Sequence, residues 1–190
     1  MDHLRSGLPE GDFERRTLIG IARSAIGAKL GQPERSFPDL PWLRCPQATF
    51  VTLTINRDLR GCVGSLLPHQ TLVEDVRENA LLAAFNDTRF SPVSLNEWRT
   101  IKISISLISP MKPYSFTDLK DLEEQISQDR EGLFLTWENR SATYLPEVWE
   151  QISDPDQFLS ELLKKGLIPQ EALPPELRAY HYRTTILKEN

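Results

Sequence analysis

Apolar residues recur along this chain at two spacings, which distinguish helices from strands. Steps of three and four residues predict a helix that begins at Phe13 and ends between Gly27 and Gly31. A second helix is predicted from Thr71 to about Asn86, because the Thr-Leu-Val-Glu sequence that opens it is a capping box. Shorter helices are predicted at Ser94–Glu97, which is a second capping box, and at Asp118–Ser127, Pro146–Trp149 and Asp154–Gly166.

Alternation of apolar and polar residues predicts strands. It is clearest where Ile101, Ile103, Ile105 and Leu107 are separated by polar side chains. The predicted strands are Thr49–Asn56, Leu59–Leu66, Ile101–Leu107, Gly132–Trp137, Arg140–Leu145 and Tyr180–Leu187. Paired strands joined by short turns outnumber βαβ crossovers, so the predicted class is α+β, with a mostly antiparallel sheet and packed helices. The proline-rich stretch Gln32–Pro46 is predicted to be irregular.

Length and composition describe an ordinary globular protein. The chain has 190 residues, 39% of them hydrophobic and 26% charged, which fits a single domain preceded by a flexible tail at residues 1–12. The 22 basic and 27 acidic side chains give a net charge of −5, which argues against nucleic-acid binding. No apolar run approaches the roughly 18 residues of a membrane span, and the N-terminus lacks a signal-peptide pattern.

Cysteine and histidine are few. Cys45 and Cys62 have no second pair, and there are three histidines, so neither a disulfide framework nor a structural metal site is expected. This usage indicates a cytoplasmic protein.

The segment Leu59–Ser65 holds the most suggestive chemistry. In an extended chain Arg60 and Cys62 share one face, and a neighbouring guanidinium favours the reactive thiolate. Gly61 and Gly64 leave the backbone accessible to a ligand. The residues alone favour a structural interpretation, because cysteine is commonly buried and glycines in strands often mark bulges.

Two further clusters could likewise be functional or structural. Asp87 and Arg89 could orient a polar substrate or simply form an ion pair with each other. Glu147 follows Tyr144 at a strand-to-helix junction, where it could bind substrate or favour a helix N-terminus. The sequence contains no GxxxxGK[ST] loop, no GxSxG elbow and no HExxH, so no complete catalytic motif is present.

Three motifs together resemble the AMMECR domain family. Leu59–Gly64 reads LRGCVG, similar to the family's LRGCIG signature with one Ile→Val change. Asp87–Val93 resembles its D-x-RF-x-PV segment, and Thr143–Val148 is similar to its TYLPEV segment. Order and spacing agree, and the resemblance extends from about Phe13 to the C-terminus.

The resemblance implies one domain over residues 13–190, with two unequal lobes around a cleft and a larger lobe that combines both ends of the chain. The signature segments would gather near that cleft. The implied catalytic residues are Cys62 and Arg60, and the implied substrate-binding residues are Gly61, Gly64, Ser65, Asp87, Arg89 and Glu147. No metal is expected, and the cofactor is left unspecified.

The family's biochemical activity is not settled, so two functions are expected. One is a Cys62-dependent enzyme acting on a small molecule. The other is a non-catalytic binding or adaptor module that works with a MEMO-type protein and a radical SAM protein, as the grouping called the AmmeMemoRadiSam system implies.

Overall fold

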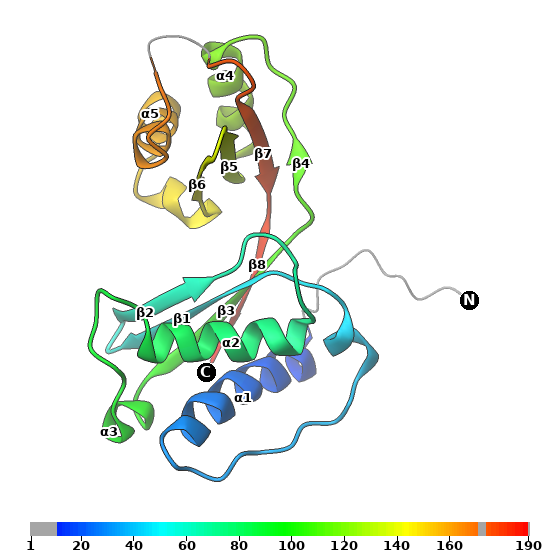
Figure 1. Ribbon diagram of the computed structural model, residues 1–190, viewed down its shortest axis with the longest axis vertical. Coiled ribbons are helices and arrows are strands. Elements are labelled where there is room, and N and C mark those ends of the chain that lie inside the picture. The colour runs from blue at the N-terminus through cyan, green and yellow to red at the C-terminus, as the bar shows by residue number, and fades with distance from the viewer. Residues whose placement is uncertain (1–10, 171–173, 190) are drawn as a thin grey trace. The chain divides into compact units, whose positions relative to one another are not determined.

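A computed structural model describes residues 11–170 and 174–189 (Figure 1). The described residues form two compact units, residues 11–108 with 185–189 and residues 109–170 with 174–184. Most of the tail predicted at residues 1–12 lies outside the described residues, but Asp12 already belongs to the first helix.

The first unit is a four-stranded sheet with two long helices. Its strands lie in the order β2-β1-β3-β8, and β1 pairs antiparallel with both β2 and β3. The elements are α1 Asp12–Lys29, the 3₁₀ helix η1 Pro41–Arg44, β1 Thr49–Ile55, β2 Asp58–Gly64, α2 Leu72–Phe85, α3 Leu95–Trp98, β3 Lys102–Ile108 and β8 Thr184–Lys188.

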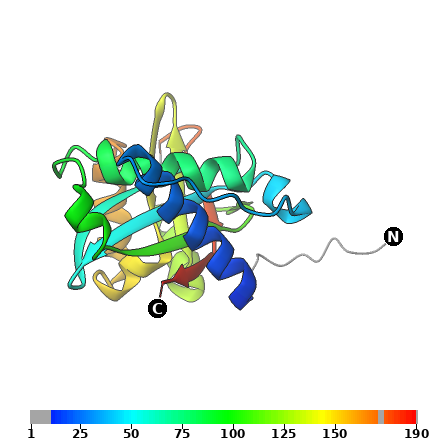
Figure 2. The same ribbon diagram turned by 90° about the horizontal axis from the view of Figure 1, so that it is seen from below.

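Helices α1 and α2 pack together and cover one face of this sheet (Figure 2). Val51, Leu53, Ile103 and Ile105 alternate toward the helices and are fully buried or nearly so. The opposite face of β1 and β3 carries threonine and serine side chains instead, because successive side chains of a strand point to opposite faces.

The hairpin between β1 and β2 contains a tight turn and a bulge. Asn56 and Arg57 have φ of 53° and 76°, the positive values that a two-residue primed turn requires. Leu53 is opposite Gly61 and Thr54 is opposite Leu59, so Arg60 is an extra residue in β2.

The second unit is also a four-stranded sheet, in the order β4-β7-β5-β6, with antiparallel pairing throughout. Its core includes Trp149 stacked on Phe158, with ring centroids 3.7 Å apart. The elements are β4 Lys112–Pro113, α4 Leu119–Asp129, β5 Gly132–Trp137, β6 Arg140–Tyr144, the 3₁₀ helix η2 Pro146–Glu150, α5 Pro155–Lys165 and β7 Arg178–Tyr182.

The α+β class is confirmed, but the last predicted strand is wrong. Residues 180–187 do not form one strand, because β7 and β8 belong to two different sheets and the chain leaves the strand at Arg183. Tyr182 and Leu187 are both buried although their spacing of five residues would put them on opposite faces of a single strand. The stretch Gln32–Pro46 is also less irregular than expected, since it contains η1.

Candidate functional site

Cys62 lies in β2 on the sheet face that is not covered by helices. An added Cβ on Gly61 would lie 2.1 Å from the carbonyl oxygen of Ala83 in α2, so Gly61 faces the helix and Cys62 faces away from it. Cys62 is directly opposite Thr52, which is opposite Ser104 on β3. The half-buried thiol Sγ is 3.3 Å from Thr52 Oγ1. One thiol and two hydroxyl groups therefore form a row across three strands.

Asp87 and Arg89 bind the backbone of Cys62 along the outer edge of β2. The Cys62 N–H donates to Asp87 Oδ2 (2.9 Å), and an Arg89 terminal nitrogen donates to the Cys62 carbonyl oxygen (3.2 Å). The two side chains also pair with each other, with 2.7 Å between Arg89 and Asp87 Oδ2. This ion pair occupies the backbone groups that a neighbouring strand would otherwise use.

The charges of this pair reinforce each other. The hydrogen bond from Arg89 is the largest cause that holds the pKa of Asp87 well below its usual range; burial opposes it, and the N–H of Cys62 adds to it. The pKa of Arg89 is raised, mainly by its hydrogen bond to Asp87 and by the charge of that carboxylate, while burial opposes the shift. The Asp87 side chain is 6% exposed and that of Arg89 is 55% exposed, so the guanidinium is accessible to solvent.

Arg60 has its own partners. The bulge interrupts the alternation on which a face shared with Cys62 was predicted. Its Nε donates to Glu97 Oε1 (2.7 Å) and a terminal nitrogen donates to the Ser91 carbonyl oxygen (2.8 Å), and the side chain is 12% exposed. Arg60, followed by the N–H of Ser94, lowers the pKa of Glu97 to about 2. A catalytic role for Arg60 stays a prediction.

The two glycines and the serine of the signature have packing roles. Gly61 allows α2 to approach β2 closely, and a Cβ on Gly64 would lie 2.3 Å from the ring of Phe50. Ser65 donates its N–H to the Thr49 carbonyl oxygen (2.9 Å), and its hydroxyl accepts from Asn79 (3.3 Å). Ligand binding by Gly61, Gly64 and Ser65 stays a prediction.

Glu147 lies in η2 of the second unit. Its Oε1 accepts a hydrogen bond from the hydroxyl of Thr184 (3.1 Å). Its Oε2 is buried and has no hydrogen-bond partner among the described residues. Substrate binding by Glu147 stays a prediction.

Three polar groups near the site were not anticipated. Thr52 contacts the thiol, and alternation along β1 already put it on the polar face. Glu97 was predicted only as a helix cap. Asp75 is fully buried and accepts from the N–H (2.8 Å) and Oγ1 (2.6 Å) of Thr49 and from Asn79 (2.8 Å). The sequence did contain a sign of this buried polar cluster, because Asp75 and Asn79 lie four residues apart on the apolar stripe of α2.

No group of three or more His, Cys, Asp or Glu side chains within residues 11–170 and 174–189 is arranged to hold a metal ion. No helix there is both long and apolar enough to cross a membrane.

Comparison with known proteins identifies relatives over nearly the whole chain. A protein of Methanothermobacter thermautotrophicus is 34% identical over 182 residues, which cover 93% of this chain and 95% of the relative. A protein of Methanopyrus kandleri is also 34% identical, over 96% of this chain and 89% of the relative. The crystal structure of an uncharacterized protein from Pyrococcus horikoshii superimposes with a TM-score of 0.76 at 27% identity, covering 91% of this chain and 90% of the other. The model of the AMMECR1 family matches residues 19–187, and this chain therefore belongs to the AMMECR1 family.

Proposed function

We propose that the first unit is a small-molecule enzyme module in which Cys62 is the nucleophile. One observation carries this proposal: Cys62 Sγ contacts the Thr52 hydroxyl at 3.3 Å while the Arg89 guanidinium is hydrogen-bonded to the backbone of the same residue. Either atom of the Thr52–Cys62 contact can be the donor, and a hydroxyl that can donate to sulfur, like a nearby cation, favours a thiolate over a thiol. The cation beside Cys62 is thus Arg89 rather than Arg60.

The surroundings of the thiol suit attack on a carbonyl carbon, in which the sulfur–carbon bond forms as the π bond of the carbonyl group breaks and its electron pair moves to the oxygen. A thiolate has already released its proton to solvent, so the attack requires no base hydrogen-bonded to Sγ. The row of hydroxyls from Thr52 and Ser104 offers polar contacts along the substrate. Asp87 and Arg60 are positioning residues, because they hold the backbone of β2 and the bulge beside Cys62.

Alkylation by iodoacetamide tests this proposal, because Cys45 is a free, exposed cysteine in the same chain. The rate at Cys62 is measured in the Cys45→Ser protein, and the rate at Cys45 in the Cys62→Ser protein. At pH 6.5 we expect Cys62 to react faster than Cys45 although it is less exposed, because Arg89 and Thr52 lie beside Cys62 and can stabilise negative charge on the attacking sulfur. Mass spectrometry of labelled peptides gives both rates.

Two substitutions test whether Arg89 and Thr52 cause the faster alkylation of Cys62. Arg89→Gln and Thr52→Val should each slow the alkylation of Cys62 and leave that of Cys45 unchanged, with thermal melting to show that the variants are folded. If Cys62 reacts no faster than Cys45, or if its rate at pH 6.5 is insensitive to both substitutions, the nucleophile proposal is wrong.

A second function, a non-catalytic adaptor, is favoured by a different observation. Among the described contacts no acid or base is hydrogen-bonded to Cys62 Sγ, and the nearby charges pair with one another as Asp87–Arg89 and Arg60–Glu97. In this proposal the module binds a MEMO-type protein or a radical SAM protein. Affinity capture from native extract should recover either partner equally well with Cys62→Ser, whereas recovery of neither would exclude the adaptor.

A further inference from the structure

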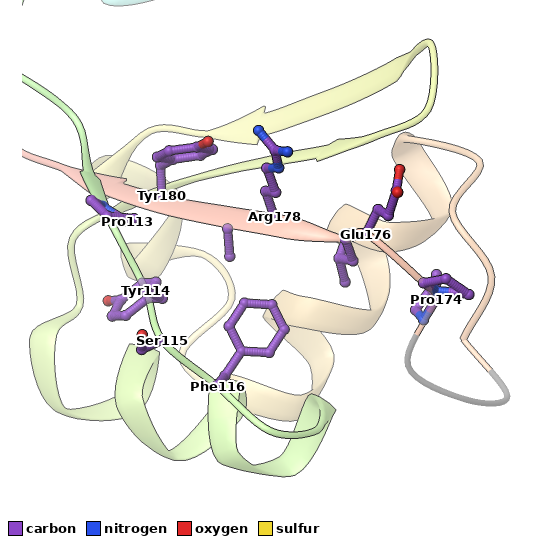
Figure 3. A pocket seen from close by; sticks show the side chains of 11 residues that line it. Pro113, Tyr114, Ser115, Phe116, Pro174, Glu176, Arg178 and Tyr180 are labelled. Atoms are coloured by element: carbon purple, nitrogen blue, oxygen red, sulfur yellow. The ribbon is translucent and has the colours of Figure 1, made fainter.

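The two sheets have four edge strands in the described part of the chain, and three of them are protected against pairing with another strand. At β2 the Asp87–Arg89 ion pair occupies main-chain groups of the outer edge. At β6 the ammonium group of Lys165 donates to the Thr143 carbonyl oxygen (2.9 Å). The third, β4, is only two residues long and ends in Pro113, which has no N–H to offer a further strand (Figure 3).

The fourth edge strand is β8, Thr184–Lys188. The residues before and after it, Arg183 and Glu189, direct main-chain groups toward β3 and the residue that follows β3, in hydrogen bonds of 2.9 Å each. Main-chain groups alternate in direction along a strand, so alternate residues of β8, beginning with Thr184, direct theirs away from the sheet. The Lys188 carbonyl oxygen agrees with this pattern, because it accepts from the side chain of Arg15 (3.0 Å).

The middle of the β8 edge is both apolar and open. Ile186 is 39% exposed, whereas Leu187 is buried in the core of the first unit, so the isoleucine lies on the other face of the sheet. Among the described residues no side chain is hydrogen-bonded to the main chain of Ile186, in contrast to that of Lys188. An edge that stays in water normally carries a charge, a proline or a bulge at such a place. An isoleucine there indicates that a partner strand covers the edge.

The sequence of β8 is complementary to itself. It reads TTILK, with its one charge at the C-terminal end. In an antiparallel pair of two copies centred on Ile186, the two isoleucines are opposite each other, and Lys188 of one copy is opposite Thr184 of the other. The two lysines are then at opposite ends of the pair, whereas parallel pairing would put them side by side. Both edges are used at once, so the assembly closes as a two-fold dimer and does not grow further.

We propose that two copies of this chain pair antiparallel through their β8 strands and form one continuous eight-stranded sheet. Main-chain hydrogen bonds at Ile186, Thr184 and Lys188 hold the pair. The Lys188 carbonyl oxygen can accept a second hydrogen bond beside that from Arg15, because it has two lone pairs. The Thr184 hydroxyl keeps its hydrogen bond to Glu147 (3.1 Å), since strand pairing uses only the main chain. Five residues bury a small area, so the dimer is reversible rather than obligate.

Sedimentation velocity of the full chain tests the dimer over a hundredfold range of protein concentration. Wild type should shift reversibly from monomer to dimer. Ile186→Lys should raise the dissociation constant roughly tenfold or more, because it removes an apolar pair and puts two like charges opposite each other. Leu67→Lys makes the same kind of change at an exposed leucine that follows β2, at the other edge of the sheet, and should leave the dissociation constant unchanged. Thermal melting shows whether both variants are folded.

A cysteine at the centre of the pair tests the geometry without adding a charge. In the Cys45→Ser, Cys62→Ser chain, Ile186→Cys would place two thiols at opposite positions with Cα atoms about 5.5 Å apart, a separation that a disulfide can span. Mild oxidation should give a covalent dimer much faster than it does for Leu67→Cys in the same background. Because this chain lacks Cys62, the result is independent of the proposed nucleophile.

Three results would each overturn the proposal. They are a monomer at every concentration, a dimer whose dissociation constant is the same with Ile186→Lys or is raised equally by Leu67→Lys, and covalent dimerisation at residue 186 that is no faster than at residue 67. The last result would mean that any dimer forms through another surface.

Discussion

At the scale of residues, the Asp87 carboxylate accepts a backbone hydrogen bond at the edge of β2 that a neighbouring strand would otherwise accept. Its Oδ2 accepts the N–H of Cys62, and the arginine two positions later donates to the carbonyl oxygen of Cys62. One ion pair thus provides both hydrogen bonds that a ninth strand would have given at this residue. The Asp-x-Arg motif therefore has a structural role that holds whatever chemistry Cys62 performs.

Replacing Asp87 should destabilise the protein in a pH-dependent way. Asp87→Asn should lower the free energy of unfolding by about 1–3 kcal/mol at pH 7, because it removes a buried, charge-assisted network. The folded pKa of Asp87 lies below its ordinary 3.8, so the stabilisation is complete above about pH 4 and is lost as the pH falls toward the folded pKa. Urea unfolding at several pH values measures the difference from wild type.

The exposed pair Asp39–Arg44 is the matched control for this measurement. Both side chains are largely exposed, so Asp39→Asn should change stability by less than about 0.5 kcal/mol at any pH. Two results would contradict this account. One is a loss of unfolding free energy for Asp87→Asn that equals the loss for Asp39→Asn, and the other is a difference between Asp87→Asn and wild type that stays the same as the pH falls.

At the scale of elements, the contact between α2 and β2 depends on the absence of a side chain at Gly61. The Ala83 carbonyl oxygen occupies the position that a Cβ would need. A backbone atom has no rotamer through which to yield, so the helix would have to move away from the strand that carries Cys62. Close helix-to-strand approach is thus a property of the same segment that carries the candidate nucleophile.

Gly61→Ala should therefore reduce the free energy of unfolding by about 1–3 kcal/mol, the usual cost of overpacking. Gly11→Ala is the control: its added Cβ would meet only the flexible Glu14 side chain, and replacing the N-cap glycine of α1 with alanine should cost no more than about 1 kcal/mol. Urea unfolding of both variants gives the comparison. If Gly61→Ala is as stable as Gly11→Ala, the close approach of α2 does not require glycine.

The limits of sequence prediction are also visible at the element scale. The capping boxes at Thr71 and Ser94 and the strands with clear alternation were predicted correctly, because these signals are local. The position of Arg60 was not, because a bulge depends on the register between two strands. For the same reason the contact between Thr52 and Cys62 could not be predicted from β1 or β2 alone.

At the scale of the whole molecule, one unit is inserted into the sequence of the other. Residues 109–184 form the second unit, and the first unit resumes at residue 185. The insertion begins and ends at neighbouring points, since Ser109 and Arg183 exchange hydrogen bonds through the Ser109 N–H and hydroxyl (2.9 Å each). The sequence contains no sign of this boundary: apolar and polar residues alternate on both sides of it, so residues 180–187 were predicted to form a single strand.

The position of β8 also sets an order of assembly during synthesis. A ribosome completes the whole inserted unit before it releases the strand that finishes the first sheet. Until then β3 has an unpaired edge, and Arg23 lacks Glu189, its ion-pair partner at 2.6 Å. The inserted unit can therefore fold on the nascent chain before the first unit has received its last strand. A stalled or truncated chain would expose the unpaired N–H and C=O groups of the β3 edge, where chaperones and proteases can bind.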